Sequence, residues 1–144
     1  MSGKPIGLRL PEDVRSEIER EQKMRGTTFS AVAVSLLREA IRMRRVPGIH
    51  FVEGVAGSRR AAVVGTGLEV WEIVRTYKEV GEDYGELRNS YPWLSEPQLR
   101  AALSYYELYP DEIEARFELE ESWTPERVKK EIPFAVARLE DDRG

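Results

Sequence analysis

The 144-residue sequence contains no cysteine and a single histidine, His50. Without cysteine the chain forms no disulfide and offers no thiolate to a metal, and one imidazole is too few for the histidine clusters of zinc sites. No apolar run approaches the roughly 20 residues that a helix needs to cross a bilayer. These absences exclude disulfide-stapled and zinc-dependent proteins, and they predict a cytoplasmic protein with no membrane partner.

The sequence also has little that points to catalysis. One histidine does not supply a convincing Ser-His-Asp arrangement, and no glycine-rich loop has a standard phosphate-binding spacing. Acidic residues of the C-terminal third offer oxygen ligands to a hard cation, but consecutive acids on a helix usually form a solvated face. They are Asp111, Glu112, Glu114, Glu118, Glu120 and Glu121. We therefore expect no enzyme, no metal and no cofactor, and keep a hydrolase only as a remote alternative.

Charge is distributed unevenly along the chain. The formal net charge is −4, yet residues 1–47 hold ten Lys or Arg against six Asp or Glu, and the remainder holds twelve against twenty. A basic first third joined to an acidic remainder is the pattern of a DNA-contacting head on an acidic body. A module of about fifty residues buries too little apolar surface to be secure alone, so we expect oligomerisation.

The first 46 residues predict a strand, a helix, a tight turn and a second helix. Residues 5–10 alternate between an apolar face and a second face that carries Arg9, which predicts a short half-buried strand. Pro11 begins the first helix and Gly26 ends it. Thr27 or Thr28 caps the second helix, which stops before Pro47. The apolar positions of that second helix are Phe29, Val32, Ala33, Leu36, Leu37, Ala40 and Ile41.

This second helix is too apolar for the surface of a monomer, so we expect it to form the core of a homodimer. The order and spacing of the four elements resemble the ribbon-helix-helix family, which includes the Arc, MetJ and CopG repressors. The resemblance covers roughly the first third of the chain. It implies that strands of two chains pair into an antiparallel ribbon, which enters the major groove of double-stranded operator DNA.

The same resemblance implies which residues contact DNA. The implied set is Lys4, Pro5, Gly7, Arg9, Arg25, Thr27 and Thr28. Arg9 is the one groove-facing side chain able to read a guanine edge, and Thr27 and Thr28 would hold a phosphate. Pro5 and Gly7 depart from the family pattern because they offer no base-reading side chain, which puts strong sequence specificity in doubt. The alternative is that residues 6–10 form an edge strand of a larger sheet, with Arg9 a solvated charge.

Beyond Pro47 and Gly48 the pattern changes to a hairpin followed by helices. Two β-rich runs, 49–52 and 61–64, flank a glycine-containing turn. Apolar spacing predicts a helix over 70–80, and Ser95 with Gln98 has capping-box spacing at the start of another helix. A short helix is predicted between them. Pro110 ends the helix that begins near Ser95, and an acidic helix begins at Asp111.

Residues 50–117 resemble a family of small bacterial domains of unknown function found in VapB-like antitoxins, the partners of PIN-domain ribonuclease toxins. The motifs that carry this resemblance are Pro47-Gly48-Ile49, residues 65–71 (GTGLEVW), residues 91–94 (YPWL), residues 99–106 (LRAALSYY) and Asp111-Glu112-Ile113. It implies a helical domain with a helix-turn-helix-like pair, 83–90 and 96–108, preceded by a β-hairpin.

Two functions compete for this second module. It would provide a second DNA contact through Arg88, Gln98 and Arg100, although nearby acids would repel phosphates. It would instead bind protein through aromatic side chains, a role that we favour; the alternative is that most of these rings belong to the core. The aromatic residues in question are Tyr84, Tyr91, Trp93, Tyr105, Tyr106 and Tyr109.

The tail, residues 122–144, has a role under the antitoxin resemblance, which implies that a C-terminal segment blocks the toxin. PIN-domain active sites hold divalent metal with carboxylates, so an inserted cation would displace the ion. The toxin-binding candidates are Trp123, Arg127, Lys129, Lys130, Phe134 and Arg138. The alternative is an ordinary solvated terminal helix.

The sequence thus predicts a mainly α fold with short β elements in three parts. Residues 1–46 form a dimeric ribbon-helix-helix, 47–121 a β-hairpin with a helix-turn-helix-like helical domain, and 122–144 a tail. The predicted function is a DNA-binding antitoxin of a VapBC-like type II toxin-antitoxin system, which autoregulates its operon and neutralises a PIN-domain ribonuclease toxin. The alternative is a stand-alone ribbon-helix-helix transcriptional repressor, whose C-terminal domain oligomerises, beyond the dimer, or senses a ligand.

Overall fold

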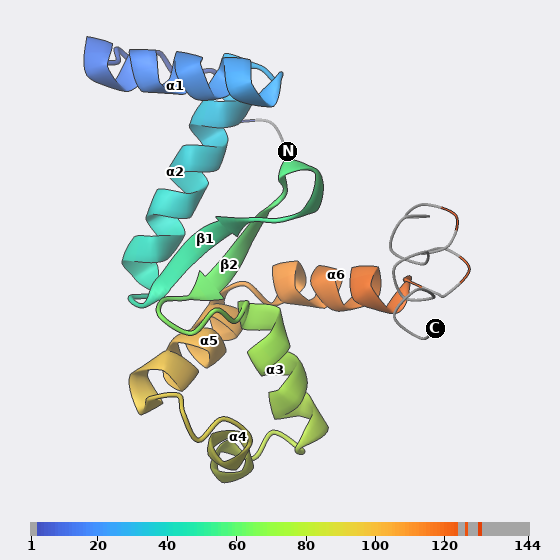
Figure 1. Cartoon of the computed structure of the whole chain (residues 1–144). Coiled ribbons are helices and arrows are strands. Elements are labelled where there is room, and N and C mark those ends of the chain that lie inside the picture. Colours follow the sequence, from blue (N-terminus) through green and yellow to red (C-terminus); the bar gives the residue numbers. More distant parts are fainter. Residues whose placement is uncertain (1–2, 124–125, 127–129, 131–144) are drawn as a thin grey trace.

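The computed structural model describes residues 3–123, 126 and 130, and is mainly helical in this part (Figure 1). Its elements in chain order are α1 (Glu12–Arg25), α2 (Phe29–Arg45), β1 (Ile49–Glu53), a 3-10 turn (Val55–Gly57), β2 (Arg59–Val63), α3 (Val70–Glu79), α4 (Tyr84–Ser90), α5 (Glu96–Leu108) and α6 (Pro110–Glu121). The predicted mainly α fold with short β elements is confirmed at this level. None of the described helices is long and apolar enough to span a membrane.

The helix boundaries follow local sequence signals. Gly26 ends α1 in the left-handed conformation, at a φ of 63°, which glycine adopts without steric cost. Thr28 caps α2 by accepting a hydrogen bond from the Ala31 amide at 3.1 Å. Ser95 and Gln98 form the reciprocal capping box at the start of α5. These three predictions are confirmed.

The predicted hairpin is present as an antiparallel pair of five-residue strands. Its register runs from Ile49 opposite Val63 to Glu53 opposite Arg59. The strands lie beside α2 on one side and α3 and α5 on the other, so the hairpin joins the N-terminal helices to the rest of the molecule (Figure 1).

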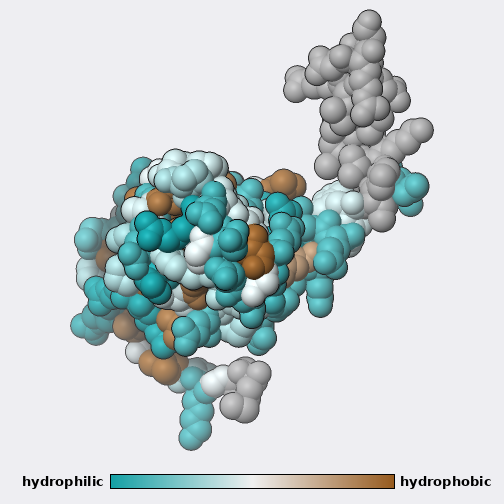
Figure 2. Space-filling model, turned by 90° about the horizontal axis from the view of Figure 1, so that it is seen from below, coloured by the Kyte–Doolittle hydropathy of each residue, from teal (hydrophilic) through white to brown (hydrophobic). Residues whose placement is uncertain are grey.

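One continuous apolar core lies in the region from Val46 to Ile113, which we call the body (residues 46–123). Ile73, Leu87, Leu99 and Tyr105 are among its fully buried side chains. They fill the space between the hairpin and the four helices α3 to α6. The face seen in Figure 2 is largely hydrophilic, with hydrophobic residues in small separate groups. The body therefore closes its own core within one chain.

The preceding part, which we call the head (residues 3–45), has almost no core of its own. Its buried apolar side chains, within the described residues, are Ile18 of α1 and Val32 of α2. Helix α1 lies across the end of α2, and α2 continues along the hairpin (Figure 1). Val46, directly after α2, is 2% exposed and packs in the body core. The last turn of α2 is therefore anchored in the body.

Candidate nucleic-acid interface

The N-terminal arm, residues 3–11, carries the predicted base-reading side chains and is exposed. Lys4, Pro5, Gly7 and Arg9 are all exposed, and the backbone of this arm forms neither helix nor strand. The predicted strand is therefore absent from the isolated chain. The physical reason is that a strand needs a neighbouring strand to pair with. The two strands of the hairpin, β1 and β2, already pair with each other.

The apolar side chains of the arm are also exposed to solvent. Ile6 is 88% exposed and Leu8 is 71% exposed. On α2, the apolar side chains of Val34, Leu37 and Ile41 are also exposed, at 48%, 54% and 56%. Residues three and four apart lie on one face of a helix, so these three form a stripe along α2. This arm-and-stripe surface is what a second copy would have to cover.

The start of α2 combines an exposed helix N-terminus with two threonines. Thr28 uses its oxygen as the helix cap, which leaves the hydroxyl hydrogen able to donate to another acceptor. Thr27 is exposed beside it. Unpaired amides at a helix N-terminus and adjacent hydroxyls are suited to a phosphate. The structure thus brings Thr27 and Thr28 together in the position that the sequence predicts for a phosphate contact.

Arg25, also predicted to contact DNA, instead joins the head to the body. Its guanidinium pairs with Glu21 of α1 at 3.0 Å and reaches Glu53 of β1 at 3.8 Å. Its side chain is 26% exposed. A phosphate would have to compete with both carboxylates, so Arg25 is a weaker candidate than Arg9, which makes no ion pair among the described residues.

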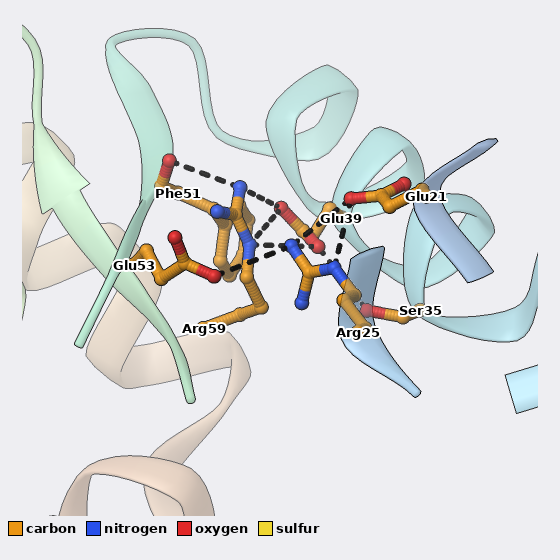
Figure 3. A network of polar contacts seen from close by, with 7 residues as sticks. All are labelled: Glu21, Arg25, Ser35, Glu39, Phe51, Glu53 and Arg59. Carbon is orange, nitrogen blue, oxygen red and sulfur yellow. Dashed lines mark hydrogen bonds and ion pairs between the residues drawn. The ribbon is translucent and has the colours of Figure 1, made fainter. Parts of the chain in front are cut away.

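Beside Arg25 lies a polar network that the sequence analysis missed (Figure 3). Its centre is Glu39, an acid of α2 that is only 8% exposed. Arg59 of β2 donates to both Glu39 oxygens, with Nη2 to Oε1 at 2.8 Å, and also donates to the Phe51 carbonyl at 3.2 Å. Ser35 donates to Glu39 at 3.2 Å. We call the Glu39–Arg59 pair the clamp, because it binds α2 to the hairpin.

A second cluster fixes the far end of α2 to the body. Arg42 Nη1 pairs with Glu112 Oε1 at 3.0 Å, donates to the Tyr105 hydroxyl at 3.3 Å and lies 4.5 Å from the centre of the Tyr109 ring. Tyr105 in turn donates a hydrogen bond to Glu112. Burial, with the neighbouring Glu112 carboxylate, raises the pKa of Tyr105 well above its ordinary value. The hydroxyl therefore stays protonated and serves as a donor.

Sequence signals for both clusters existed but were not specific. Glu39 is a lone acid on an apolar and basic helix, and a cation such as Arg42 in the last turn of a helix is favoured by the helix dipole even without a partner. Their partners lie 20 and 70 residues further along the chain, at Arg59 and Glu112, so only the folded chain reveals the pairs.

The second DNA contact proposed from the sequence is only partly available. Gln98 uses both ends of its amide: its oxygen accepts from the Ser95 amide at 2.9 Å, and its nitrogen donates to the Val64 carbonyl at 3.3 Å. Arg100 pairs with Glu96 at 2.9 Å and lies over the Tyr84 ring. Arg88 is exposed on α4 and makes no ion pair within the described residues.

The aromatic residues predicted for protein binding divide into core and surface. Tyr105 is fully buried, which makes that prediction wrong for this residue: its ring packs against Phe51 and Tyr109 inside the body. Trp93, in the turn before α5, is 69% exposed and packs edge-on against Tyr91. The remaining tyrosines are half-buried against the core.

The predicted toxin-binding residues lie at the end of the described chain or outside it. Trp123 is half-buried and lines a groove beside α6, and Lys130 is exposed. The candidates Arg127, Lys129, Phe134 and Arg138 lie outside the described residues. In the described part, no group of three or more His, Asp or Glu side chains is placed to hold a metal ion.

Comparison with known proteins adds one match. A family model described as "Protein of unknown function (DUF433)" matches residues 56–106. The matched segment runs from the hairpin turn through most of α5, so it lies within the body and leaves the head unmatched. No curated protein and no solved structure matches the chain.

Proposed function

We propose that this protein is a dimeric DNA-binding antitoxin. In this proposal two heads pair through their arms and α2 helices into a ribbon-helix-helix, and the dimer binds operator DNA. The body and tail neutralise a PIN-domain ribonuclease toxin of a VapBC-like system. The observation that carries the proposal is the exposed apolar surface formed by the arm and by the α2 stripe.

Leaving that apolar surface in water is unfavourable. Five large apolar side chains, Ile6, Leu8, Val34, Leu37 and Ile41, are between 48% and 88% exposed in one chain. Large apolar side chains exposed together along one helix face, as on α2, are typical of interaction surfaces. A second copy supplies an identical stripe and an identical arm. Pairing of the two arms would give each the hydrogen-bonded neighbour that it lacks, which supports the ribbon.

The charges of the head support DNA as the ligand of that ribbon. Alternation in the arm places Arg9 on the face opposite Ile6 and Leu8, so burying the apolar face leaves Arg9 projecting outward. Arginine forks onto the O6 and N7 atoms of guanine in the major groove. Thr27 and Thr28 at the start of α2 would hold the flanking phosphate, and Lys4 would add a charge contact.

The DNA part of the proposal is tested by the Arg9→Ala variant. The probe is a labelled duplex that spans the region upstream of the chain's own gene, titrated at two salt concentrations. We expect Arg9→Ala to bind about 10-fold more weakly, because one bidentate base contact contributes about 1–3 kcal/mol. Arg20→Ala, which removes an exposed arginine of α1 outside the predicted contact set, serves as the matched control and should bind as the native chain does. Equal affinity of the native chain and Arg9→Ala at matched salt would contradict the groove role.

The antitoxin part is tested by partner identification and by truncation. The tagged full chain is captured from its native lysate after nuclease treatment, so that DNA cannot bridge proteins. A stoichiometric partner with PIN-type carboxylates is expected, and truncation after Glu121 should abolish its neutralisation while sparing DNA binding. Self-association alone would favour the stand-alone repressor instead.

A further inference from the structure

A groove of about 540 Å³ lies between the hairpin and α6. We call it the β2–α6 groove. Its apolar walls come from Val55, Ala61, Trp71, Ile113, Leu119 and Trp123. Two of these side chains are strongly exposed, Val55 at 72% and Leu119 at 43%. Pockets of about 300–1,000 Å³ with mainly apolar walls are typical of binding sites.

The groove follows an edge of the hairpin. Three consecutive β2 residues, Arg59, Arg60 and Ala61, line it. Successive side chains of a strand point to opposite faces of the sheet, so a groove on either face would meet only alternate residues. Lining by consecutive residues therefore indicates that the groove runs beside the backbone of β2.

The hydrogen-bond pattern shows that this edge is open. The Gly54 amide donates to the Ser58 carbonyl at 2.7 Å, and the Val64 amide donates to the Gly48 carbonyl at 2.9 Å. These bonds flank the ladder and make the even-numbered β2 residues the ones that bond to β1. The amides and carbonyls of Arg59 and Ala61 therefore point away from β1.

Along this outer edge, the described residues of the same chain form hydrogen bonds only towards the C-terminal end of β2. The Val63 amide donates to the Leu68 carbonyl at 3.0 Å, next to the isolated bridge between Ala62 and Glu69. The same bridge brings the Val70 amide to the outward Ala61 carbonyl, so within the described residues the outward groups left for a partner are the Arg59 amide and carbonyl and the Ala61 amide. An unpaired edge of this kind is a template for another strand.

The side chains around the edge also have unmet hydrogen-bonding capacity. Within the described part, Arg60 Nε, Glu69 Oε1, Trp71 Nε1 and Arg116 Nε are buried without a hydrogen-bond partner. All four belong to residues that line the β2–α6 groove. Three are donors, which suits an occupant that presents carbonyl oxygens. A helix uses its carbonyls internally, whereas an extended segment offers them along both sides.

We propose that the β2–α6 groove binds an extended segment of another protein, which adds to the outer edge of β2 as a third strand. Its backbone pairs with the Arg59 amide and carbonyl and with the Ala61 amide, and its alternate apolar side chains rest on the wall formed by Leu119 and Ile113. A five-residue strand is about 17 Å long, which matches the roughly 18 Å of the 12-residue α6. This binding site is in the body, and it does not depend on DNA binding by the head.

The first measurement is amide hydrogen exchange on the full chain alone, followed residue by residue by NMR. The Arg59 and Ala61 amides should exchange fast, in contrast to the Arg60 and Ala62 amides, which bond to β1. Protection of Arg59 and Ala61 in the isolated chain would overturn the proposal, because the edge would then be filled by the chain itself or by a second copy.

The second measurement selects a ligand from a library of random short peptides displayed on phage, panned against the full chain. We expect enriched peptides with apolar residues at alternate positions and, on adding the synthetic peptide, protection of the Arg59 and Ala61 amides. No enrichment, or binding without this protection, would overturn the proposal.

Matched variants locate the bound peptide. Leu119→Glu places a charge on the groove wall and should weaken peptide binding at least about 10-fold. Leu108→Glu is the control, because Leu108 is equally exposed, at 41% against 43%, but lies outside the groove. Ala61→Pro removes an outward amide and spares the bonds to β1, so it should also weaken binding. Equal affinities for Leu119→Glu and Leu108→Glu would overturn the assignment.

Discussion

The head and the body of this chain differ in how much of their apolar surface they bury alone. The body encloses Ile73, Leu87 and Leu99 without any exposure, whereas the head leaves Leu37 and Ile41 more than half exposed. Both regions are rich in helix, so helix content does not separate them. What separates them is the number of layers: the body packs helices on a hairpin, and the head offers one helix pair with nothing on its outer face.

The two ends of the chain therefore differ in how far each encloses its own apolar side chains. The body holds the elements of a self-sufficient core. The head depends on contacts with the body, through the clamp and the Arg42 cluster on one face of α2. Under the proposed dimer, the other face of α2 would contact a second copy, which would link the dimer to the position of the body.

The largest effect is expected for a variant that disrupts the proposed dimer of the head. Leu37→Glu would bury a carboxylate in the proposed dimer interface, which costs about 3–5 kcal/mol and weakens the dimer more than about 100-fold. Analytical ultracentrifugation measures the dissociation constant. Leu108→Glu, on the body, should leave it unchanged. A dimer that tolerates Leu37→Glu would remove the α2 stripe from the interface.

The next largest effect is expected for a variant that disrupts the core of the body. Leu99→Ala removes a fully buried side chain and should lower the free energy of unfolding by about 2–5 kcal/mol. All three tryptophans, Trp71, Trp93 and Trp123, lie in the body, so tryptophan fluorescence in urea reports its unfolding. Leu108→Ala is the exposed control. Similar losses for the two variants would show that the body core is not closed as described.

A smaller effect tests how the two regions are coupled. Glu39→Gln keeps the shape of the clamp but leaves the half-buried Arg59 without its carboxylate, at a cost of about 1–3 kcal/mol. In the native chain, the unfolding transition followed by circular dichroism, which reports all helices, should coincide with the transition followed by tryptophan fluorescence. In the variant, the circular dichroism transition should come first. Glu17→Gln removes an exposed α1 pair and serves as the control. Coincident transitions in Glu39→Gln would contradict the clamp's role.

The smallest effect concerns the surface of the body. The Tyr106 hydroxyl, and then Lys78 at 3.2 Å, stabilise the Glu114 carboxylate and lower its pKa. A lowered folded-state pKa contributes stability above the ordinary pKa, and that stability is lost as the pH falls through the folded value. Because Glu114 is half exposed, the contribution should stay below about 1 kcal/mol.

The check is an NMR titration of the Glu114 carboxyl carbon in Tyr106→Phe. Removing the hydroxyl should raise the Glu114 pKa towards its ordinary value. Tyr84→Phe is the control, since the Tyr84 hydroxyl makes no hydrogen bond within the described residues. An unchanged pKa in Tyr106→Phe would assign the shift to Lys78 alone.

Local signals allowed the order of elements to be predicted from the sequence. Gly26, Thr28, Ser95 and Pro110 act within one helical turn, so their effects are visible without knowledge of the fold. The hairpin was likewise evident from two β-rich runs around a turn. The predicted strand over residues 5–10 is not formed in the single chain, where no strand of the described residues pairs with this arm.

Long-range contacts explain what sequence reasoning missed at the candidate site. Arg25 has the charge of a phosphate contact, but the register of β1 brings Glu53 to it. Gln98 is predicted both as a helix cap and as a base contact, but the cap uses its amide oxygen and the Val64 carbonyl takes its amide nitrogen. The β2–α6 groove depends on how α6 lies against the hairpin, which no spacing in the sequence encodes.

The mass of the full chain in solution, measured by light scattering at micromolar concentration without DNA, tests the central claim most directly. The account predicts a particle of two 16.5 kDa chains, because the arm and the α2 stripe need a second copy to cover them. A monomer at this concentration would contradict the ribbon, and with it the proposed reading of DNA by Arg9.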